Sequence, residues 1–562
     1  MTGRFSWTTR RMVGAWACLA VLGVGVDATG VCAQPVPAGG GRVVALHGRW
    51  EERFETATPV ANPSDVEFWL TLISPGGKTH KVYGFWDGWT TWRVRFLAAE
   101  EGPWQFTTHS QPPLAGLDGR QGQFVCRRQP AADPAVLPRG PLRVRPGATH
   151  FERSDGTPFF WLGDTAWNGP LLASADDWET YLQDRQSKRF SVIQFVLIAP
   201  WRTAHTDAEG QVGYHVDGER LVIHPPFFQR MDARIEAIQR RGLVSAAVLL
   251  WALGRKEVSP GQLPDPLAIR LARYAVARYQ GHDVVWLLGG DENYQGQRGQ
   301  RWAEIGRAVF PDEMPRAPVT LHPQGMQWPF EPLRKEKWLD FLGYQSGHGD
   351  DSRTLAWIHS GPVSQAWSHE PIKPVVNLEP PYEGHLAYQS RQPHSDYSVR
   401  RACYWSLMAA PMAGLTYGSH GIWSWQLSPG IPQDHSRTGV APTWREAMQR
   451  PGSHQMGYLV RLVTSLRWTE LRPAAKWLVR QPFPDDPARF VSVCATSDGG
   501  QALAYLPVGG AIELDPKRVE KVQGGIRWFD PRTGEFRPAA AEAGGRFAAP
   551  DEQDWVLVLG GG

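Results

Sequence analysis

The sequence predicts an α/β fold, a (β/α)8 TIM barrel flanked by an N-terminal β-sandwich and a small C-terminal antiparallel β domain. Short apolar runs alternate with helical patterns through the middle of the chain, at about 140–455, as they do in βα units. Residues 43–128 and 470–562 instead show period-two alternation broken by turn residues, which predicts antiparallel strands. The length of 562 residues has room for these domains.

The composition is that of a globular protein with an ample core, since 42% of residues are hydrophobic and 20% are charged. The net charge is +3, and no basic run or tail is present, which argues against nucleic acid as a partner. The 27 tryptophans are unusually many. An indole offers a flat apolar face and one N–H donor, which suits sugar rings, although filling cores is its more ordinary use.

The N-terminus resembles a secretory signal over residues 1–33. Basic residues including Arg10 and Arg11 precede an apolar run at 13–26, and Val31-Cys32-Ala33 fits a cleavage site. We therefore expect a periplasmic or secreted protein without a membrane span after cleavage. A lipid anchor on Cys32 is the less favoured alternative.

The cysteines of the processed chain show no pattern of pairing or metal binding. Cys126, Cys403 and Cys494 are far apart in the sequence. We expect them to be buried free thiols.

The N-terminal module follows a Pro/Gly-rich linker at 34–42. Its apolar residues alternate at Val66, Phe68, Leu70 and Leu72, and the pattern returns around Trp92. Short strands at this spacing predict a β-sandwich, to which we assign a structural role. A second, proline-rich linker covers 128–148.

The central segment contains eight candidate strands separated by helical patterns, as a TIM barrel with long loops requires. We expect helices at 175–189, 228–241, 266–280 and 397–410. The strands are expected at 159–162, 192–198, 243–250, 284–288, 319–321, 341–344, 375–376 and 415–417. In the C-terminal domain we expect strands at 490–493, 502–506, 526–529 and 555–559.

Polar and aromatic side chains follow the predicted barrel strands. Barrel enzymes place their chemistry at the C-terminal ends of their strands, and such side chains at one face suit a sugar-cleaving pocket. We expect the following residues to bind substrate: Asp164, Trp167, His205, Trp251, Glu292, Asn293, His322, Gln345, His348, Asn377, Tyr382, Glu383 and Trp423.

Two carboxylates stand out because glycoside hydrolysis needs one group to protonate the leaving oxygen and a second to act as nucleophile or activate water. Asp291 follows the fourth strand, and Glu379 follows the seventh, where two prolines fix the exit of the chain. Strands four and seven lie roughly opposite each other at a barrel mouth. We predict Asp291 as general acid/base and Glu379 as nucleophile, with Glu292 and Glu383 as competitors.

Other chemistries have weaker support. No HExxH or comparable metal spacing, phosphate-binding loop or Gly-x-Ser-x-Gly elbow occurs, so we expect neither a metal nor an organic cofactor. The main alternative is a non-catalytic extracellular protein that binds glycan or matrix on a barrel scaffold. A peptidase is a third possibility, without a zinc motif or an ordered nucleophile to support it.

Three runs resemble the apiosidase-like glycoside hydrolase family. They are Pro158-Phe-Phe-Trp-Leu-Gly-Asp-Thr-Ala-Trp167, Val285-Trp-Leu-Leu-Gly-Gly-Asp291 and Pro374-Val-Val-Asn-Leu-Glu-Pro-Pro-Tyr-Glu383. The turn at 528–534 is similar to the family's tail domain, sometimes labelled a collagen-binding module. The resemblance implies a (β/α)8 barrel, an aspartate acid/base at Asp291 and a glutamate nucleophile at Glu379. It also makes apiose-containing pectin side chains one candidate substrate. Taken together, we expect cleavage of a plant or microbial polysaccharide, with retention because a strand-four acid and a strand-seven nucleophile are commonly close enough.

Overall fold

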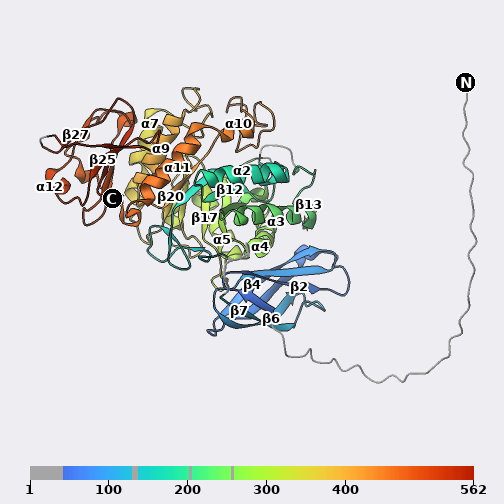
Figure 1. Cartoon of the computed structure of the whole chain (residues 1–562). Helices are drawn as coiled ribbons and strands as arrows, with labels where there is room; N and C mark the ends of the chain where they lie inside the picture. Colours follow the sequence, from blue (N-terminus) through green and yellow to red (C-terminus); the bar gives the residue numbers. More distant parts are fainter. Residues whose placement is uncertain (1–41, 129–136, 202–205, 255–258, 543, 562) are drawn as a thin grey trace, which may run out of the picture. The chain divides into compact units, whose positions relative to one another are not determined.

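The computed structural model describes residues 42–128, 137–201, 206–254, 259–542 and 544–561. Within these ranges the predicted fold is confirmed: a sandwich, a parallel barrel and an antiparallel domain follow one another along the chain (Figure 1). The signal region at 1–33 and the first linker fall outside the described residues. No helix in the described ranges is long and apolar enough to cross a bilayer.

The N-terminal sandwich has strand order β1-β7-β6-β3-β4-β5-β2, antiparallel except for the parallel pair β1–β7. Strand β4 belongs to both layers, because Tyr83 pairs with Trp69 of β3 and Gly84 pairs with Val94 of β5. A Cβ at Gly84 would lie 2.3 Å from the Phe68 ring, so the corner needs glycine. The elements are β1 (Arg42–Ala45), β2 (Arg49–Glu55), η1 (Pro63–Asp65), β3 (Glu67–Ile73), β4 (Thr79–Gly88), β5 (Thr91–Leu97), β6 (Gly102–Gln111) and β7 (Gln121–Arg127).

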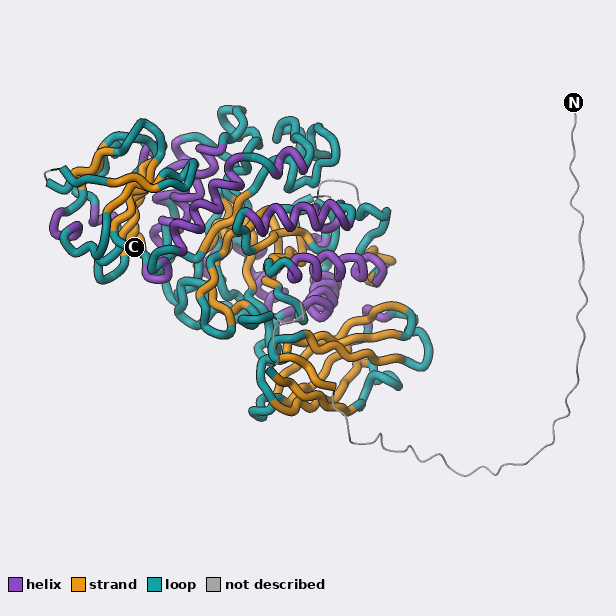
Figure 2. The backbone as a smooth tube through the Cα atoms, in the orientation of Figure 1, coloured by secondary structure: helices purple, strands orange, loops and turns teal. Residues whose placement is uncertain are grey.

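The barrel strands run parallel in the order β17-β16-β15-β12-β11-β20-β19-β18, and helices surround them (Figure 2). The strands are β11 (Trp161–Thr165), β12 (Val192–Val196), β15 (Val244–Trp251), β16 (Val284–Glu292), β17 (Val319–Pro323), β18 (Leu342–Gln345), β19 (Val375–Glu379) and β20 (Gly414–Tyr417). The longer helices are α2 (Ala175–Ser187), α3 (Pro225–Arg240), α4 (Asp265–Tyr279), α5 (Gly296–Val309), α7 (Ser352–Ser360), α9 (Asp396–Met408) and α11 (Pro451–Thr464).

Shorter elements complete the barrel domain. A three-stranded sheet precedes β11, and a hairpin precedes α3. These elements are β8 (Leu142–Arg143), β9 (Phe151–Arg153), β10 (Pro158–Phe159), α1 (Gly169–Leu172), β13 (Tyr214–Asp217), β14 (Arg220–Ile223), α6 (Phe330–Leu333), α8 (Pro362–Ala366) and α10 (Trp444–Met448).

Several barrel strands extend past the apolar runs that predicted them. Strand β11 reaches Thr165, so Asp164 lies within the strand rather than after it. Strand β16 continues through Asp291, and β19 continues through Glu379. Backbone pairing continues after the side chains become polar, and Asp164 and Glu379 are buried as well, so an apolar run marks only the apolar part of a strand. The four predicted helices are present as α2, α3, α4 and α9, with small differences at their ends.

A side chain joins the two ends of the barrel sheet. No backbone ladder connects β17 and β18 among the described strands. The Thr320 hydroxyl donates to the Phe341 carbonyl at 2.7 Å and accepts from the Gly343 N–H at 2.9 Å. Thr320 is fully buried, so this hydroxyl satisfies backbone groups that would otherwise lack a partner at the seam.

We predict that Thr320→Val destabilises the protein by about 1–3 kcal/mol, because two buried backbone groups lose a hydrogen-bond partner while the side-chain shape is kept. Urea denaturation would measure the free energy of unfolding. Thr464→Val, at an exposed position, is the matched control and should change it by under about 0.5 kcal/mol. Equal stability of the two variants would contradict the bridging role of Thr320.

The C-terminal domain contains a six-stranded antiparallel sheet of order β21-β22-β23-β28-β25-β26. A separate two-stranded sheet, β24-β27, belongs to the same domain. Arg400 of α9 makes a bidentate, buried pair with Asp554, with both distances 2.7 Å, which docks this sheet on the barrel. The elements are β21 (Arg472–Pro473), β22 (Ser492–Ala495), β23 (Ala502–Leu506), β24 (Ala511–Glu513), α12 (Pro516–Val519), β25 (Ile526–Phe529), β26 (Phe536–Pro538), β27 (Arg546–Ala548) and β28 (Trp555–Leu559).

The predicted free thiols are confirmed, since Cys126, Cys403 and Cys494 are buried and unpaired. Burial raises the pKa of the Cys126 thiol to about 11, which keeps it protonated and unreactive.

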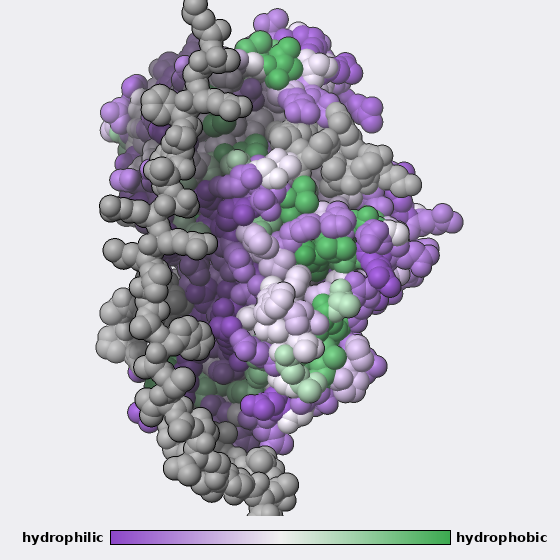
Figure 3. All heavy atoms as spheres, turned by 90° about the vertical axis from the view of Figure 1, so that its right-hand side faces the viewer, coloured by the Kyte–Doolittle hydropathy of each residue, from purple (hydrophilic) through white to green (hydrophobic). Residues whose placement is uncertain are grey.

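On the face in Figure 3, hydrophilic residues predominate and hydrophobic ones form separate patches.

Candidate active site

A cavity of about 330 Å³ opens at the C-terminal ends of the barrel strands. Its volume falls in the usual range of small-molecule sites, and its lining mixes indoles with polar side chains. The lining residues are Trp201, Leu253, Asp291, Gln324, Gly325, Gln345, Gly347, His348, Glu379, Tyr382, His385, Tyr388, Trp423 and His435.

Glu379 ends β19 and is almost completely buried in the cavity wall. Each oxygen of its carboxylate has a histidine partner. His348 Nε2 lies 3.0 Å from Oε1, and His322 Nε2 lies 3.3 Å from Oε2. The two imidazoles hold the carboxylate in one orientation at the cavity wall.

The tautomer of a neutral His348 follows from the second contact of its ring. The backbone N–H of Tyr382 donates to His348 Nδ1 at 3.3 Å, so a neutral His348 carries its proton on Nε2. That proton then points at Glu379. Trp167 Nε1 in turn donates to the Tyr382 hydroxyl at 3.1 Å, which leaves the phenolic proton for the hydrogen bond to Glu379.

These donors set the charge of Glu379. Burial alone would raise the pKa of this carboxyl, but hydrogen bonds from His322 and His348 outweigh it and lower the pKa well below the ordinary range. Glu379 is therefore ionised at neutral pH, as a nucleophile must be. The pKa of Tyr382 shifts the other way, raised by burial and then by the neighbouring carboxylate, so this hydroxyl stays a donor.

Asp291 reaches the cavity because β16 is irregular at its end. The register against β17 shifts on both sides of Gly290, and Asp291 itself adopts a φ of +55°. A Cβ at Gly290 would lie 2.3 Å from the Trp251 ring, so glycine allows this close packing. As a result Asp291 lines the cavity, whereas Glu292 does not and instead pairs with Arg298 at 3.0 Å.

Aromatic rings form another part of the wall. Trp201, Trp423 and His435 lie with all three ring centroids 5.1 Å apart. His385, also in the lining, donates Nδ1–H to the Leu386 carbonyl at 2.7 Å. Burial, then the neighbouring His348 and His420, lower the pKa of His385, so its Nε2 is a neutral acceptor available for a sugar hydroxyl.

The structure brings together six of the predicted site residues. In addition to Asp291 and Glu379, they are Gln345, His348, Tyr382 and Trp423. Three more lie directly behind the lining. His322 contacts Glu379, Trp167 binds Tyr382, and the Trp251 ring centroid lies 4.9 Å from that of Trp167.

The other predicted site residues within the described ranges lie away from the cavity lining. Asp164 is fully buried between Arg185 at 2.9 Å and the Tyr181 hydroxyl at 2.5 Å, because it lies in the strand and faces the helix layer. Asn377 hydrogen-bonds Ser346 and Ser406, both at 2.9 Å. Neither lines the cavity, so both brace the barrel instead.

Three other predicted residues also lie away from the lining. Glu383 accepts from the Tyr417 hydroxyl at 2.5 Å and from the Gly452 N–H at 3.0 Å, in a buried structural contact. Glu292 is the last residue of β16 and Asn293 begins the loop after it, and neither lines the cavity. His205 falls outside the described residues.

Sequence reasoning missed several lining residues. Gln324, Tyr388 and His435 come from loops, a few to many residues beyond their strands, where strand periodicity gives no signal. His385 had a usable signal, because it follows Glu379 closely in the same loop. Among the described residues, no group of three or more His, Cys, Asp or Glu side chains is arranged to hold a metal ion.

We predict that His348→Ala moves the acid limb of the pH profile of kcat/KM upward by about one unit or more. With one donor gone, burial is less opposed and the pKa of Glu379 rises, so activity is lost at a higher pH as the solution is acidified. His348→Gln, whose amide still donates, should shift the limb less. Identical profiles for wild type and both variants would contradict the role of His348.

Family models match segments of all three domains of the chain. A family model described as "Apiosidase-like, catalytic domain" matches residues 146–470. Models described as "Domain of unknown function (DUF5060)" and "Putative collagen-binding domain of a collagenase" match residues 44–111 and 485–560. The search of curated proteins gives no match.

Several solved structures share the fold. A "Glycoside hydrolase" has 23% identity and a TM-score of 0.65, covering 75% of this chain and 97% of its own. A glycoside hydrolase family 5 protein from Bacteroides vulgatus has 22% identity and a TM-score of 0.65, covering 75% of this chain and 93% of its own. A "putative glycoside hydrolase" from Bacteroides vulgatus, at 17% identity and a TM-score of 0.68, covers 93% of this chain and 100% of its own.

Proposed function

Because the chain belongs to the apiosidase-like catalytic-domain family of glycoside hydrolases, we propose that its barrel hydrolyses glycosidic bonds with two carboxylates and retention of configuration. One observation carries the proposal. Asp291 and Glu379, from two different strands, line one cavity, and Glu379 is held ionised there by two histidines. An ionised carboxylate at the wall of a cavity is the state that a nucleophile needs.

In the proposed mechanism, Asp291 gives its proton to the glycosidic oxygen while Glu379 attacks the anomeric carbon. The bond to the leaving group breaks, and a covalent glycosyl-enzyme forms on Glu379. Asp291, now ionised, removes a proton from water, which displaces Glu379 and restores both groups. Trp201, Trp423 and His385 contact the sugar, through the faces of the indoles and the acceptor nitrogen of the imidazole.

We propose a plant or microbial polysaccharide as substrate, with apiose-containing pectin side chains as the first candidate. The family supports this choice, and the cavity, with two indoles and several neutral polar groups, suits a sugar ring. The signal-like pattern at 1–33 supports export to the periplasm or beyond.

The test is reducing-sugar release from a panel of pectic and hemicellulosic polysaccharides, followed by proton NMR of the first product formed. Retention predicts that the initial anomer matches that of the substrate. Appearance of the opposite anomer would replace the nucleophile role of Glu379 with that of a base. Release from no glycan would favour the alternative, a glycan-binding protein on a barrel scaffold.

A further inference from the structure

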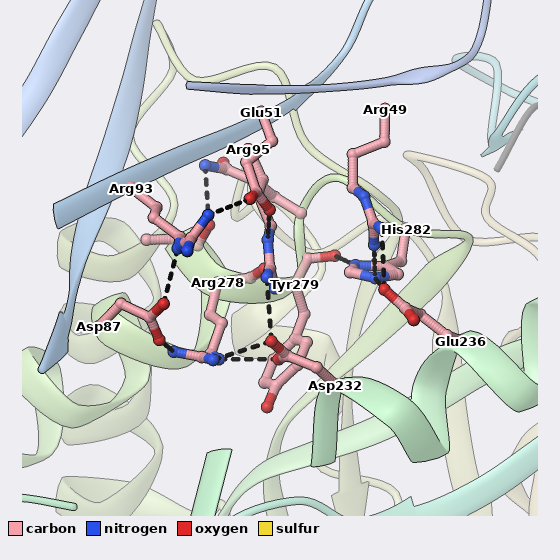
Figure 4. Close-up of polar contacts among 12 residues, drawn as sticks. Arg49, Glu51, Asp87, Arg93, Arg95, Asp232, Glu236, Arg278, Tyr279 and His282 are labelled. Atoms are coloured by element: carbon pink, nitrogen blue, oxygen red, sulfur yellow. Dashed lines mark hydrogen bonds and ion pairs between the residues drawn. The ribbon is translucent and has the colours of Figure 1, made fainter. Parts of the chain in front are cut away.

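The N-terminal sandwich is fixed to the barrel by a network of paired charged side chains (Figure 4). Arg95 of β5 pairs with Asp232 of α3 at 2.9 Å, and Arg278 of α4 pairs with Asp232 at 2.8 Å and with Asp87 of β4 at 2.9 Å. Glu51 completes the sandwich side, accepting from Arg95 at 2.6 Å. Arg95 and Arg278 are both buried, and each has acidic partners on the other module or within hydrogen-bond reach.

This network also supports the wall of a second cavity. The guanidiniums of Arg95 and Arg278 lie over the Phe85 ring, at 5.1 and 4.8 Å from its centroid. Arg278 Nη1 also donates to the Tyr274 hydroxyl at 3.3 Å. Phe85 and Tyr274 both line that cavity, so its wall is held in place by fully paired charges. The cavity is therefore a preformed space between two fixed modules.

The second cavity has about 320 Å³, close to the volume at the barrel mouth. It combines aromatic rings from both modules with acidic, basic and amide side chains. The lining residues are Pro63, Ser64, Asp65, Val66, Glu67, Phe68, Tyr83, Gly84, Phe85, Trp86, Trp92, Gln111, Ile223, Arg270, Arg273 and Tyr274.

We propose that this junction cavity is a second, non-catalytic binding site for a neutral sugar unit of a polysaccharide. A purely apolar ligand would cover Glu67 without offering it a hydrogen bond, and a small ion would leave Tyr83 and Trp86 unused. A sugar ring has both apolar C–H faces and hydroxyl groups, so it matches both kinds of lining. The proposal does not depend on hydrolysis by the barrel, and only the choice of probes follows from the proposed function.

Hydrogen-bonding capacity remains at one edge of the cavity. Glu67 Oε1 lies 3.4 Å from Lys81 Nζ and 3.7 Å from Arg273 Nη1, longer than the roughly 2.7–2.9 Å of a strong charge-assisted bond. Gln111 sits directly opposite Glu67 on the neighbouring strand. The pair therefore presents a carboxylate and an amide side by side, as hydroxyl recognition requires.

The hairpin beside the cavity supplies a further aromatic ring. Trp89 is 75% exposed and has a φ of +52°, a conformation that bulky residues rarely adopt. Its carbonyl accepts from Nε1 of Trp86, a lining residue, at 3.0 Å. An indole kept exposed in this conformation extends the aromatic surface available to a sugar chain beyond the cavity.

The test uses the full chain carrying Asp291→Asn, so that a bound polymer is not consumed. Affinity electrophoresis in gels containing the same pectic and hemicellulosic polysaccharides measures retention. In this background Glu67→Ala with Gln111→Ala is compared with Glu55→Ala and Gln105→Ala, which change the same residue types at exposed positions of the sandwich. Thermal melting of every variant checks the fold.

We expect at least one polymer to retard the parent protein, and the cavity pair to weaken that affinity about tenfold or more, equivalent to about 1.4 kcal/mol. The control pair should leave it unchanged, and Trp423→Ala, in the barrel cavity, should leave the junction component in place. Retention equal in the cavity and control pairs would overturn the proposal, and so would retention abolished by Trp423→Ala or absent with every polymer. Wild-type sugar release, measured separately, reports on the proposed hydrolysis instead.

Discussion

Glu379→Gln is expected to lower kcat by at least about a thousandfold while the protein stays folded. The amide keeps the shape of the side chain, and its single oxygen can still accept from one of the two histidines, which lie at 3.0 and 3.3 Å from the carboxylate. It cannot form the glycosyl-enzyme, because the nucleophilic charge is gone. Sugar release from the active polysaccharide measures the loss, and the melting temperature confirms the fold.

Glu383→Gln is the matched control for this prediction. Glu383 is buried against Tyr417 and Gly452, away from the cavity lining, so its loss acts on stability. We expect a lower melting temperature and a kcat within about tenfold of wild type. If Glu383→Gln removed activity from a folded protein and Glu379→Gln did not, the nucleophile would be Glu383.

Asp291→Asn is expected to lower kcat/KM about 10²–10⁴-fold on the natural polysaccharide, because the departing oxygen is then no longer protonated. An aryl glycoside of the released sugar with a dinitrophenolate leaving group needs no proton. Its cleavage to the glycosyl-enzyme should therefore fall much less. The ratio of the two losses identifies the acid more securely than either loss alone.

Glu292→Gln tests the neighbouring competitor. Glu292 pairs with the exposed Arg298 outside the cavity, so the variant should keep nearly wild-type activity on both substrates.

Equal losses on both substrates for Asp291→Asn would mean that Asp291 positions the sugar and does not donate the proton.

Much of the fold could be predicted from the sequence, because barrel strands are apolar and the helices between them are amphipathic. The exact strand ends could not. At Asp164 the strand continues through a buried charge that pairs with Arg185. A polar residue in the sequence does not reveal whether it lies within a strand or in the loop after it. The seam at Thr320 is likewise a long-range contact, which local patterns do not report.

The site was predictable where it rests on strand-end residues and harder to predict elsewhere. Asp291 and Glu379 follow recognisable runs, and both line the cavity. Which acid of each pair faces the cavity depends on the shifted register around Gly290 and on the packing of Glu383, both tertiary effects. His435 and Tyr388 come from loops whose paths depend on contacts made far away in the chain.

The tryptophans divide in a similar way. Their abundance suggested sugar binding, yet many are packed inside, among them Trp50, Trp161 and Trp286. Of the tryptophans in the described ranges, Trp201 and Trp423 alone line the barrel cavity. Composition reports how much aromatic surface a chain carries, and the fold decides where it is used.

The paired charges between sandwich and barrel also constrain the order of events on the ribosome. Arg95 is made 137 residues before its partner Asp232, so at roughly 5–20 residues per second it waits on the order of 10 s. During that interval Arg95 has Glu51 of the sandwich as its acidic partner, and the face that will meet the barrel shows water a mixture of arginines and carboxylates. The network is completed only when α3 and α4 follow, because Asp232 and Arg278 supply the barrel side of these pairs.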